Sequence, residues 1–263
     1  MKSTIMSRRW TARAVSALAI LISLASVDAV VAGACNFEPL GESRVDSIVD
    51  GRTIRLIDGR EIRLTGIETV AAGTTQNITT SALAQMVTGH TVTLHGDSET
   101  PDRYGRQHAF ATVEGATTTV QAALLDQGAA VASGTAADPT CAAELHAAET
   151  SARIARRGIW AGPNVIKNAE SPGDILARIG RFTLVEGKAR SVRQAGATVY
   201  INFGPRWTRD FAVTIPKRTA PLFTGTPLKS LENKRIRVRG WIERRGGPRI
   251  EASRPGQIEV VGD

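Results

Sequence analysis

Two Asp-Gly steps, eight residues apart, divide one alternating stretch and constrain the first half of the chain to a fold that begins with β-hairpins. The stretch covers residues 43–64 and reads SRVDSIVDGRTIRLIDGREIRL, with Asp50-Gly51 and Asp58-Gly59 between short apolar runs. Asp-Gly between alternating runs is a strong hairpin signal, because tight turns between antiparallel strands need a positive φ that glycine adopts easily. The sequence therefore predicts consecutive antiparallel strands in this stretch.

Three helices and two more strands are expected after these hairpins. Gly128 is expected to end the second helix and Gly158 the third, which opens after Asp138-Pro139. Strands mixed with helices in this proportion describe a small barrel packed by helices. The predicted helices are 80–88, 119–127 and 141–157, and the predicted strands are 91–94 and 107–114.

The second half of the chain reads as strands after a linker. Residues 161–174, AGPNVIKNAESPGD, contain two prolines and two glycines and show little periodicity, which is typical of a linker. Five strands and one short helical stretch over 221–231 suit a small Greek-key barrel of the OB type. The predicted strands are 182–192, 198–203, 210–215, 235–243 and 249–252.

The fold class expected from these patterns is mainly β with helices, as two OB-like barrels in tandem. The predicted organisation is a signal peptide over 1–34, a first domain over 35–162, a linker over 163–177 and a basic OB-like β domain over 178–263.

The N-terminus has the order of a secretory signal peptide. Four basic side chains precede the run AVSALAILISLASV, which is shorter than the roughly 20 residues of a membrane-spanning helix. A small-x-small site follows at Ala32-Gly33-Ala34, so we expect cleavage before Cys35 and export to the periplasm or the medium. Lipidation of Cys35 is the alternative, although Ala32 stands where a lipidation signal prefers Leu or Val.

Cys35 and Cys141 are the only cysteines, and both lie in the part expected to be exported. An even count in an oxidising compartment favours one disulfide, which would tie the mature N-terminus to the third predicted helix. Two free thiols are the alternative.

The two halves of the chain carry opposite net charge. Residues 35–170 contain 11 Lys and Arg against 16 Asp and Glu, a net charge of −5, whereas residues 171–263 contain 18 against 8, a net charge of +10. A polyanion that binds this protein is therefore expected to be attracted mainly by the second half.

Four segments of the first half, in order, resemble the staphylococcal nuclease (thermonuclease) family. Each alone would be weak, but their order and spacing are specific. The resemblance covers residues 43–160 and implies an OB barrel with added helices, so the first domain is identified as staphylococcal nuclease-like. The segments are DGRT at 50–53, RLTGIET at 63–69, DRYGR at 102–106 and a helix end with the pattern Ala-Arg-x-x-x-x-Gly-x-Trp at 152–160.

The resemblance implies calcium-dependent cleavage of phosphodiesters in DNA and RNA. Carboxylates hold the cation, a further carboxylate activates water, and two guanidinium groups grip the phosphate as charge develops on it. Arg63 and Arg106 fall at the two arginine positions, and Glu68 falls at an aspartate position of the metal site. These three are the catalytic positions that the chain retains.

Two residues that this chemistry needs are missing. Arg52 replaces a metal-ligand aspartate, and Val70-Ala71 replaces the Pro-Glu that carries the general base. Exchanging a carboxylate for a guanidinium changes the local charge by two units, so a divalent cation should be repelled. We expect Glu68 to pair with Arg52 or Arg63 in place of a metal, the alternative being a lone ligand. Rescue by Glu61 or Asp97 is a further alternative.

A basic row in the second half is the other candidate site. It alternates strictly, so its members share one face of a predicted strand while Ile236 and Val238 face the core. Three guanidiniums and an indole in a row resemble the groove by which OB-folds hold single-stranded nucleic acid, and a solvated strand face is the alternative. The row consists of Arg235, Arg237, Arg239 and Trp241, with Arg206-Trp207-Thr208-Arg209 and Arg244-Arg245 as extensions.

Other site types find less support. Tyr104 is expected either to stack on a base or sugar or to belong only to its turn. The spacing of His90, His95, His108 and His146 does not suit zinc, and no resident cofactor is predicted.

The sequence predicts an exported protein that binds nucleic acid or another polyanion with little or no cleavage. Two alternatives are an active, atypical metal-dependent nuclease, which would use calcium, and a structural or partner-binding envelope protein. The sequence does not indicate an oligomeric state.

Overall fold

The two Asp-Gly turns lead into a closed five-stranded barrel, as predicted. Asp50 pairs with Thr53 across the first turn, and Gly59 has a φ of 88° in the second. The barrel order is β1-β2-β3-β6-β5, with β3 and β6 parallel and the other described pairs antiparallel. Its strands are β1 (Pro39–Asp50), β2 (Thr53–Leu56), β3 (Glu61–Leu64), β5 (Thr91–His95) and β6 (Arg106–Val113).

The structure is a computed structural model that describes residues 1, 35, 37–70, 74–96, 100–225 and 227–262. The predicted signal peptide, the missing general-base position Ala71 and the carboxylate of Asp97 lie outside these residues. No helix in the described part of the chain is long and apolar enough to cross a membrane.

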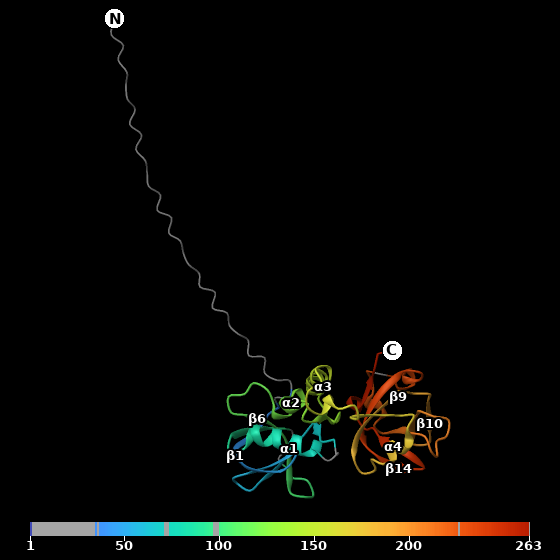
Figure 1. Cartoon of the computed structure of the whole chain (residues 1–263), viewed down its shortest axis with the longest axis horizontal. Coiled ribbons are helices and arrows are strands. Elements are labelled where there is room, and N and C mark those ends of the chain that lie inside the picture. The colour runs from blue at the N-terminus through green and yellow to red at the C-terminus, as the bar shows by residue number, and fades with distance from the viewer. Residues whose placement is uncertain (2–34, 36, 71–73, 97–99, 226, 263) are drawn as a thin grey trace. The chain divides into compact units, whose positions relative to one another are not determined.

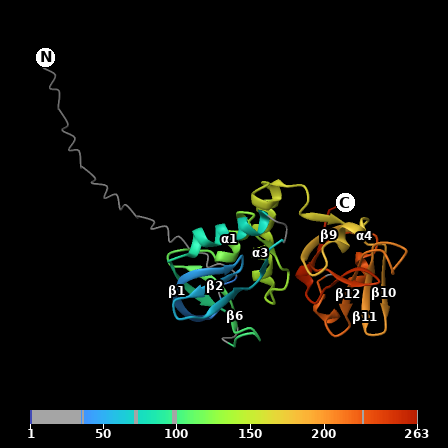
Figure 2. The same ribbon diagram turned by 60° about the horizontal axis from the view of Figure 1, so that its bottom comes forward.

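Three helices pack against the barrel, in agreement with the sequence (Figures 1 and 2). The first begins earlier than predicted, while Gly128 takes a φ of 67° after the second, as the sequence suggested. Asp138 caps the third helix, because its Oδ1 accepts a hydrogen bond of 2.7 Å from the backbone N–H of Cys141. The helices are α1 (Thr74–Val87), α2 (Val120–Asp126) and α3 (Pro139–Ile154), with a short pair β4 (Ile67–Glu68) and β7 (Val131–Ala132) beside them.

The predicted disulfide is present. Cys35 and Cys141 are bonded across 106 residues, which fastens the start of the described fold to α3. Both half-cystines are buried in the core that fills the barrel and its helices.

The second half is built from two sheets. The five-stranded sheet has the order β10-β11-β12-β15-β14, and the four-stranded sheet has the order β16-β13-β9-β8. The mainly β class is therefore confirmed, whereas the OB-like description of this half stays a prediction. The strands are β8 (Ile166–Asn168), β9 (Phe182–Lys188), β10 (Ser191–Ala195), β11 (Thr198–Asn202), β12 (Ala212–Pro216), β13 (Arg235–Trp241), β14 (Glu243–Arg245), β15 (Gly247–Glu251) and β16 (Ile258–Val260).

Two predicted strands each divide into two. The stretch predicted over 182–192 bends at Ala189, because β9 pairs with β13 in one sheet and β10 with β11 in the other. The stretch over 235–243 bends at Ile242 for the same reason. The predicted helical stretch over 221–231 consists of two 3-10 turns, η2 (Ala220–Leu222) and η3 (Leu228–Leu231).

The segment predicted as a linker is structured in part. Within 163–177, β8 pairs in parallel with β9, and the helix α4 (Pro172–Leu176) buries Ile175 in the core of the second half. The sequence pattern missed β8 and α4 because neither element is long enough to show a period. The prolines and glycines around them are typical of a linker. A smaller cluster, which includes Trp160, Phe182 and Leu184, joins side chains of both halves.

Candidate functional site

The family positions come together around a hollow of about 280 Å³ beside the barrel. The turn after β1 supplies Arg52, β3 supplies Arg63, β4 supplies Glu68, and the start of β6 supplies Arg106. The parallel pairing of β3 with β6 brings the two arginine-bearing strands side by side. The sequence thus identified residues that the fold does bring together.

Glu68 and Arg52, the two positions that the resemblance assigns to a metal site, form an ion pair. The distance from Arg52 Nη1 to Glu68 Oε1 is 2.5 Å, and the carboxylate side chain is only 9% exposed. Burial raises the pKa of Glu68 to about 7, although the charges of Arg52 and Arg63 oppose the shift. Burial also lowers the pKa of Arg52. The predicted salt bridge is confirmed, with Arg52 rather than Arg63 as the partner.

Arg63 is held by neighbours on both sides. Its Nη1 donates hydrogen bonds of 2.7 Å to Asp50 Oδ2 and to Thr53 Oγ1. Burial alone would raise the pKa of Asp50, but the backbone N–H of Arg52 and the charge of Arg63 lower it overall. The Arg63 side chain lines the hollow, and its guanidinium is already paired with the carboxylate of Asp50.

Arg106 is held in a similar way within the Asp102–Arg106 turn. Its Nε and Nη2 donate to Asp102 Oδ2 at 3.1 and 2.8 Å, and this bonding holds the pKa of Asp102 well below its usual range. Tyr104 is exposed, and the guanidiniums of Arg103 and Arg106 lie 4.7 and 4.9 Å from the centre of its ring. The ring thus contacts two arginines of its own turn.

The donor chemistry of this hollow does not fit calcium. A calcium ion needs six to eight oxygen ligands, several of them carboxylates, and here a guanidinium lies against the carboxylate of Glu68. No group of three His, Cys, Asp or Glu side chains suited to a metal occurs among the described residues. The arrangement can receive an anion if Asp50 and Asp102 release Arg63 and Arg106. Among the described residues that line the hollow, both carboxylates, Glu68 and Asp102, are paired with an arginine.

The basic row on β13 does not form an exposed face, which corrects the sequence-based expectation. Ile236 and Val238 do face the core of the second half, but Arg237 and Arg239 on the opposite face are buried too. Arg237 pairs with Glu186 at 2.7 Å and with Glu259 at 3.0 Å, and Arg239 pairs with Glu149 at 2.5 Å. The physical reason is that carboxylates of β9, β16 and α3 cover this face of β13, so its arginines face protein rather than solvent.

The two ends of the row are more open, yet each has a partner. Arg235 pairs with Glu186 at 2.7 Å, and the half-exposed indole of Trp241 meets Phe182 edge to face. The row as a whole therefore has its charges compensated by carboxylates and does not supply a free cationic groove.

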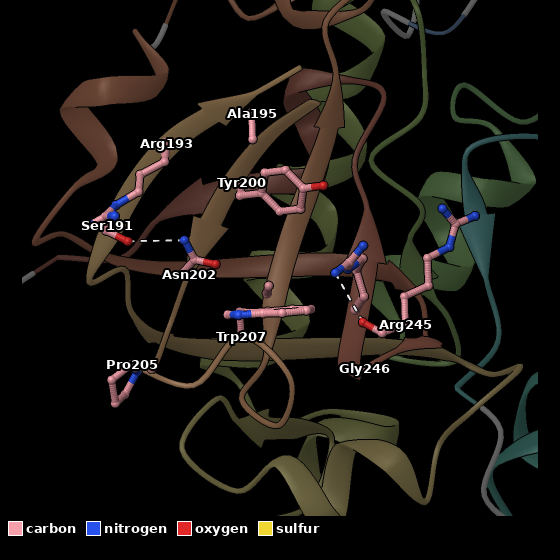
Figure 3. A pocket seen from close by; sticks show the side chains of 12 residues that line it. Ser191, Arg193, Ala195, Tyr200, Asn202, Pro205, Trp207, Arg245 and Gly246 are labelled. Carbon is pink, nitrogen blue, oxygen red and sulfur yellow. Dashed lines mark hydrogen bonds between the residues drawn. The ribbon is translucent and has the colours of Figure 1, made fainter. Parts of the chain in front are cut away.

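A second hollow, which the sequence analysis covered only in part, lies on the five-stranded sheet (Figure 3). The sequence pointed to Trp207 and Arg245 as extensions of the β13 row, but it missed Arg193, Tyr200 and Arg249. The signal that could have found Arg193 and Tyr200 is the alternation of polar with buried apolar residues in β10 and β11, whereas Arg249 lies on β15.

Comparison with known proteins agrees with the motifs of the barrel. Residues 61–162 match the family described as Staphylococcal nuclease homologue. The match begins at β3 and covers Arg63, Glu68 and Arg106, whereas Arg52 lies just before it. The comparison with curated proteins found no significant match to this sequence.

Proposed function

Because residues 61–162 form a staphylococcal nuclease-like domain, we propose that this protein binds nucleic acid or another polyanion and cleaves it slowly or not at all. The observation that supports the proposal is the ion pair between Arg52 and Glu68, because the resemblance assigns these two positions to the metal ion of the family's chemistry. Repulsion from the guanidinium makes the binding of a divalent cation at this position less favourable.

Retention of Arg63 and Arg106 supports the binding part of the proposal. A planar guanidinium donates hydrogen bonds to two phosphate oxygens at once, which makes arginine better suited than lysine to this task. Both side chains are pre-positioned, by Asp50 and Asp102, at the rim of the hollow. An incoming phosphate would have to compete with those carboxylates, so this site alone is expected to bind weakly.

The charge of the second half supplies further attraction. Residues 171–263 carry a net charge of +10, which favours binding of a polyanion at low salt. The buried arginines of β13 account for part of this charge, so the contacts must come from other residues of the second half.

Export is part of the proposal. The basic start, apolar run and small-x-small site of residues 1–34 support it, and the bonded pair Cys35 and Cys141 is of the kind that persists in an oxidising compartment.

The test is an assay of cleavage and of binding on the same oxidised protein. Fluorescent single- and double-stranded DNA and RNA are incubated with and without calcium, with Arg106→Ala as the control for the barrel site. We expect no metal-dependent cleavage and salt-sensitive binding. Calcium-dependent cleavage that disappears in Arg106→Ala would replace the proposal by an active, atypical nuclease. Absence of binding to every nucleic acid tested would point instead to a structural or partner-binding protein.

A further inference from the structure

The hollow on the five-stranded sheet has a volume of about 740 Å³ and lies on the face of that sheet opposite the core. In the ladder, Arg193 pairs with Tyr200 and Ala212 pairs with Arg249, so their side chains share one face. The intervening residues, among them Val192 and Ile201, are buried in the core of the second half. The sheet therefore has one apolar face turned inward and one basic and aromatic face turned outward.

The walls of this hollow are cationic. The described residues that line it include three arginines and no Asp or Glu. Within the described part of the chain, no carboxylate forms an ion pair with Arg193 or Arg249, and Arg245 has only a loose contact of 3.7 Å with the half-exposed Glu243. The arginines of the barrel site and of β13, by contrast, are paired with carboxylates. The arginines of the hollow are thus less closely paired than those of the barrel site and of β13, although the charge of Arg193 also acts on Glu232.

Two aromatic rings accompany these cations. Trp207 is 69% exposed, and Tyr200 lies under the guanidinium of Arg249, 5.5 Å from it. Figure 3 shows Tyr200 and Trp207 projecting into the same hollow, with Arg193 and Arg245 on opposite sides. An indole left this exposed beside Arg193 and Arg249, which have no ion-pair partner in the described part of the chain, indicates a surface that a flat, anionic ligand covers.

The loop that carries Trp207 is held in place before any ligand arrives. The backbone N–H of Arg206 donates to Asp210 Oδ2 at 2.8 Å, and the N–H of Asp210 donates to the carbonyl of Arg206 at 2.7 Å. Gly204 permits this closure, because a Cβ there would lie 2.2 Å from the Asp210 carboxylate. Little ordering entropy is then lost on binding, which favours affinity.

We propose that this hollow binds single-stranded nucleic acid, with bases stacked on Trp207 and Tyr200 and phosphates bound by Arg193, Arg245 and Arg249. The inference rests on the proposed function, which gives the class of ligand. It adds where the nucleic acid binds and that it is single-stranded. A duplex keeps its bases stacked on one another, whereas a single strand offers them to aromatic rings. A sulfated polysaccharide would satisfy the arginines but would gain less from the two rings.

The experiment measures the affinity of the oxidised protein for a fluorescein-labelled oligonucleotide of about 20 nucleotides, by fluorescence anisotropy over a series of salt concentrations. Trp207→Leu removes the stacking surface and Trp207→Phe retains one. Arg193→Gln with Arg245→Gln removes two exposed cations of the hollow. Arg218→Gln, at an exposed position that does not line the hollow, is the matched control for charge.

We expect Trp207→Leu to weaken binding about 5- to 100-fold and Trp207→Phe to recover most of the loss. The Arg193→Gln and Arg245→Gln pair should reduce the slope of log affinity against log salt by about 1.4, while Arg218→Gln leaves affinity within about twofold. Duplex DNA should compete poorly.

Three results would overturn the inference. If the parent binds the oligonucleotide and the Trp207 and paired arginine variants bind it equally well, the binding site lies elsewhere and the proposed function still stands. A parent that binds heparin through Trp207 but no oligonucleotide makes the hollow a polysaccharide site and also removes the proposed function. Preference for duplex over single strand excludes stacking as the mode of binding.

Discussion

The guanidinium of Arg239 on β13 lies 2.5 Å from the carboxylate of Glu149 on α3, and both side chains are buried, with exposed fractions of 0% and 1%. The pair is fixed by Ala132, whose carbonyl accepts from Arg239 Nη1 at 2.9 Å and whose N–H donates to Glu149 Oε2 at 3.0 Å. Among the described residues, Arg239 Nε, Arg239 Nη2 and Glu149 Oε1 find no hydrogen-bond partner. A strand of the second half is thus locked to a helix of the nuclease-like domain by a buried ion pair.

Removing one partner of this pair should be more harmful than removing both. Arg239→Met leaves a buried carboxylate without its cation and is expected to lower the free energy of unfolding by about 3–5 kcal/mol. The double variant Arg239→Met with Glu149→Leu should recover most of that loss. Urea denaturation of the singles and the double measures the coupling, with exposed Arg235→Met as a control expected to cost less than about 1 kcal/mol. A double variant as unstable as the sum of its singles would contradict this account.

The same pair shows what the sequence could and could not predict. Alternation over 235–241 correctly placed Ile236 and Val238 in the core, because period two specifies which residues share a face. It could not specify what covers the other face, since a solvated face and one buried against a distant helix have the same pattern. Glu149 lies 90 residues from Arg239, and only the fold brings them together.

The barrel site was more accessible to prediction. An ion pair of Glu68 with Arg52 or Arg63 followed from short motifs, and the disulfide followed from a count of cysteines, while the choice of Arg52 came from the structure. The division of 182–192 into β9 and β10 did not, because a change of sheet depends on which distant strands pair with each part.

Glu68 should make stability depend on pH. Its pKa is raised from 4.5 to about 7, so the folded state binds more protons than the unfolded chain between these values. Stability that is present below pH 4.5 is therefore lost as the pH rises toward 7, by up to about 3 kcal/mol. Glu68→Gln cannot ionise and should lack this component. Urea midpoints of both proteins from pH 4 to pH 8 measure it, and parallel curves would mean that the ion pair keeps Glu68 charged throughout.

Arg52→Asp should create affinity for calcium. The substitution removes the cation and places a third carboxylate near Glu68 and Asp50, whose charges both act on position 52. Because a ligand of the folded state alone stabilises it, millimolar calcium should raise the Tm of Arg52→Asp and leave the parent unchanged. Arg52→Ala, which removes the charge without adding a ligand, is the matched control. An equal response of Arg52→Ala and Arg52→Asp would show that loss of repulsion, rather than a new ligand, is responsible.

Gly134 is expected to be indispensable for the contact between the two halves. It adopts a φ of 72°, and a Cβ on it would lie 2.4 Å from the carbonyl oxygen of Gly256, which also receives a hydrogen bond of 3.0 Å from His146. Gly59 has a φ of 88° but open space around it, so Gly59→Ala carries only the backbone strain of about 1–2 kcal/mol. Gly134→Ala carries the same strain together with a collision of two backbones, which cannot be relieved by rotating a side chain. Thermal unfolding should therefore show a larger loss for Gly134→Ala than for Gly59→Ala, and equal losses would mean that the two backbones separate there at little cost.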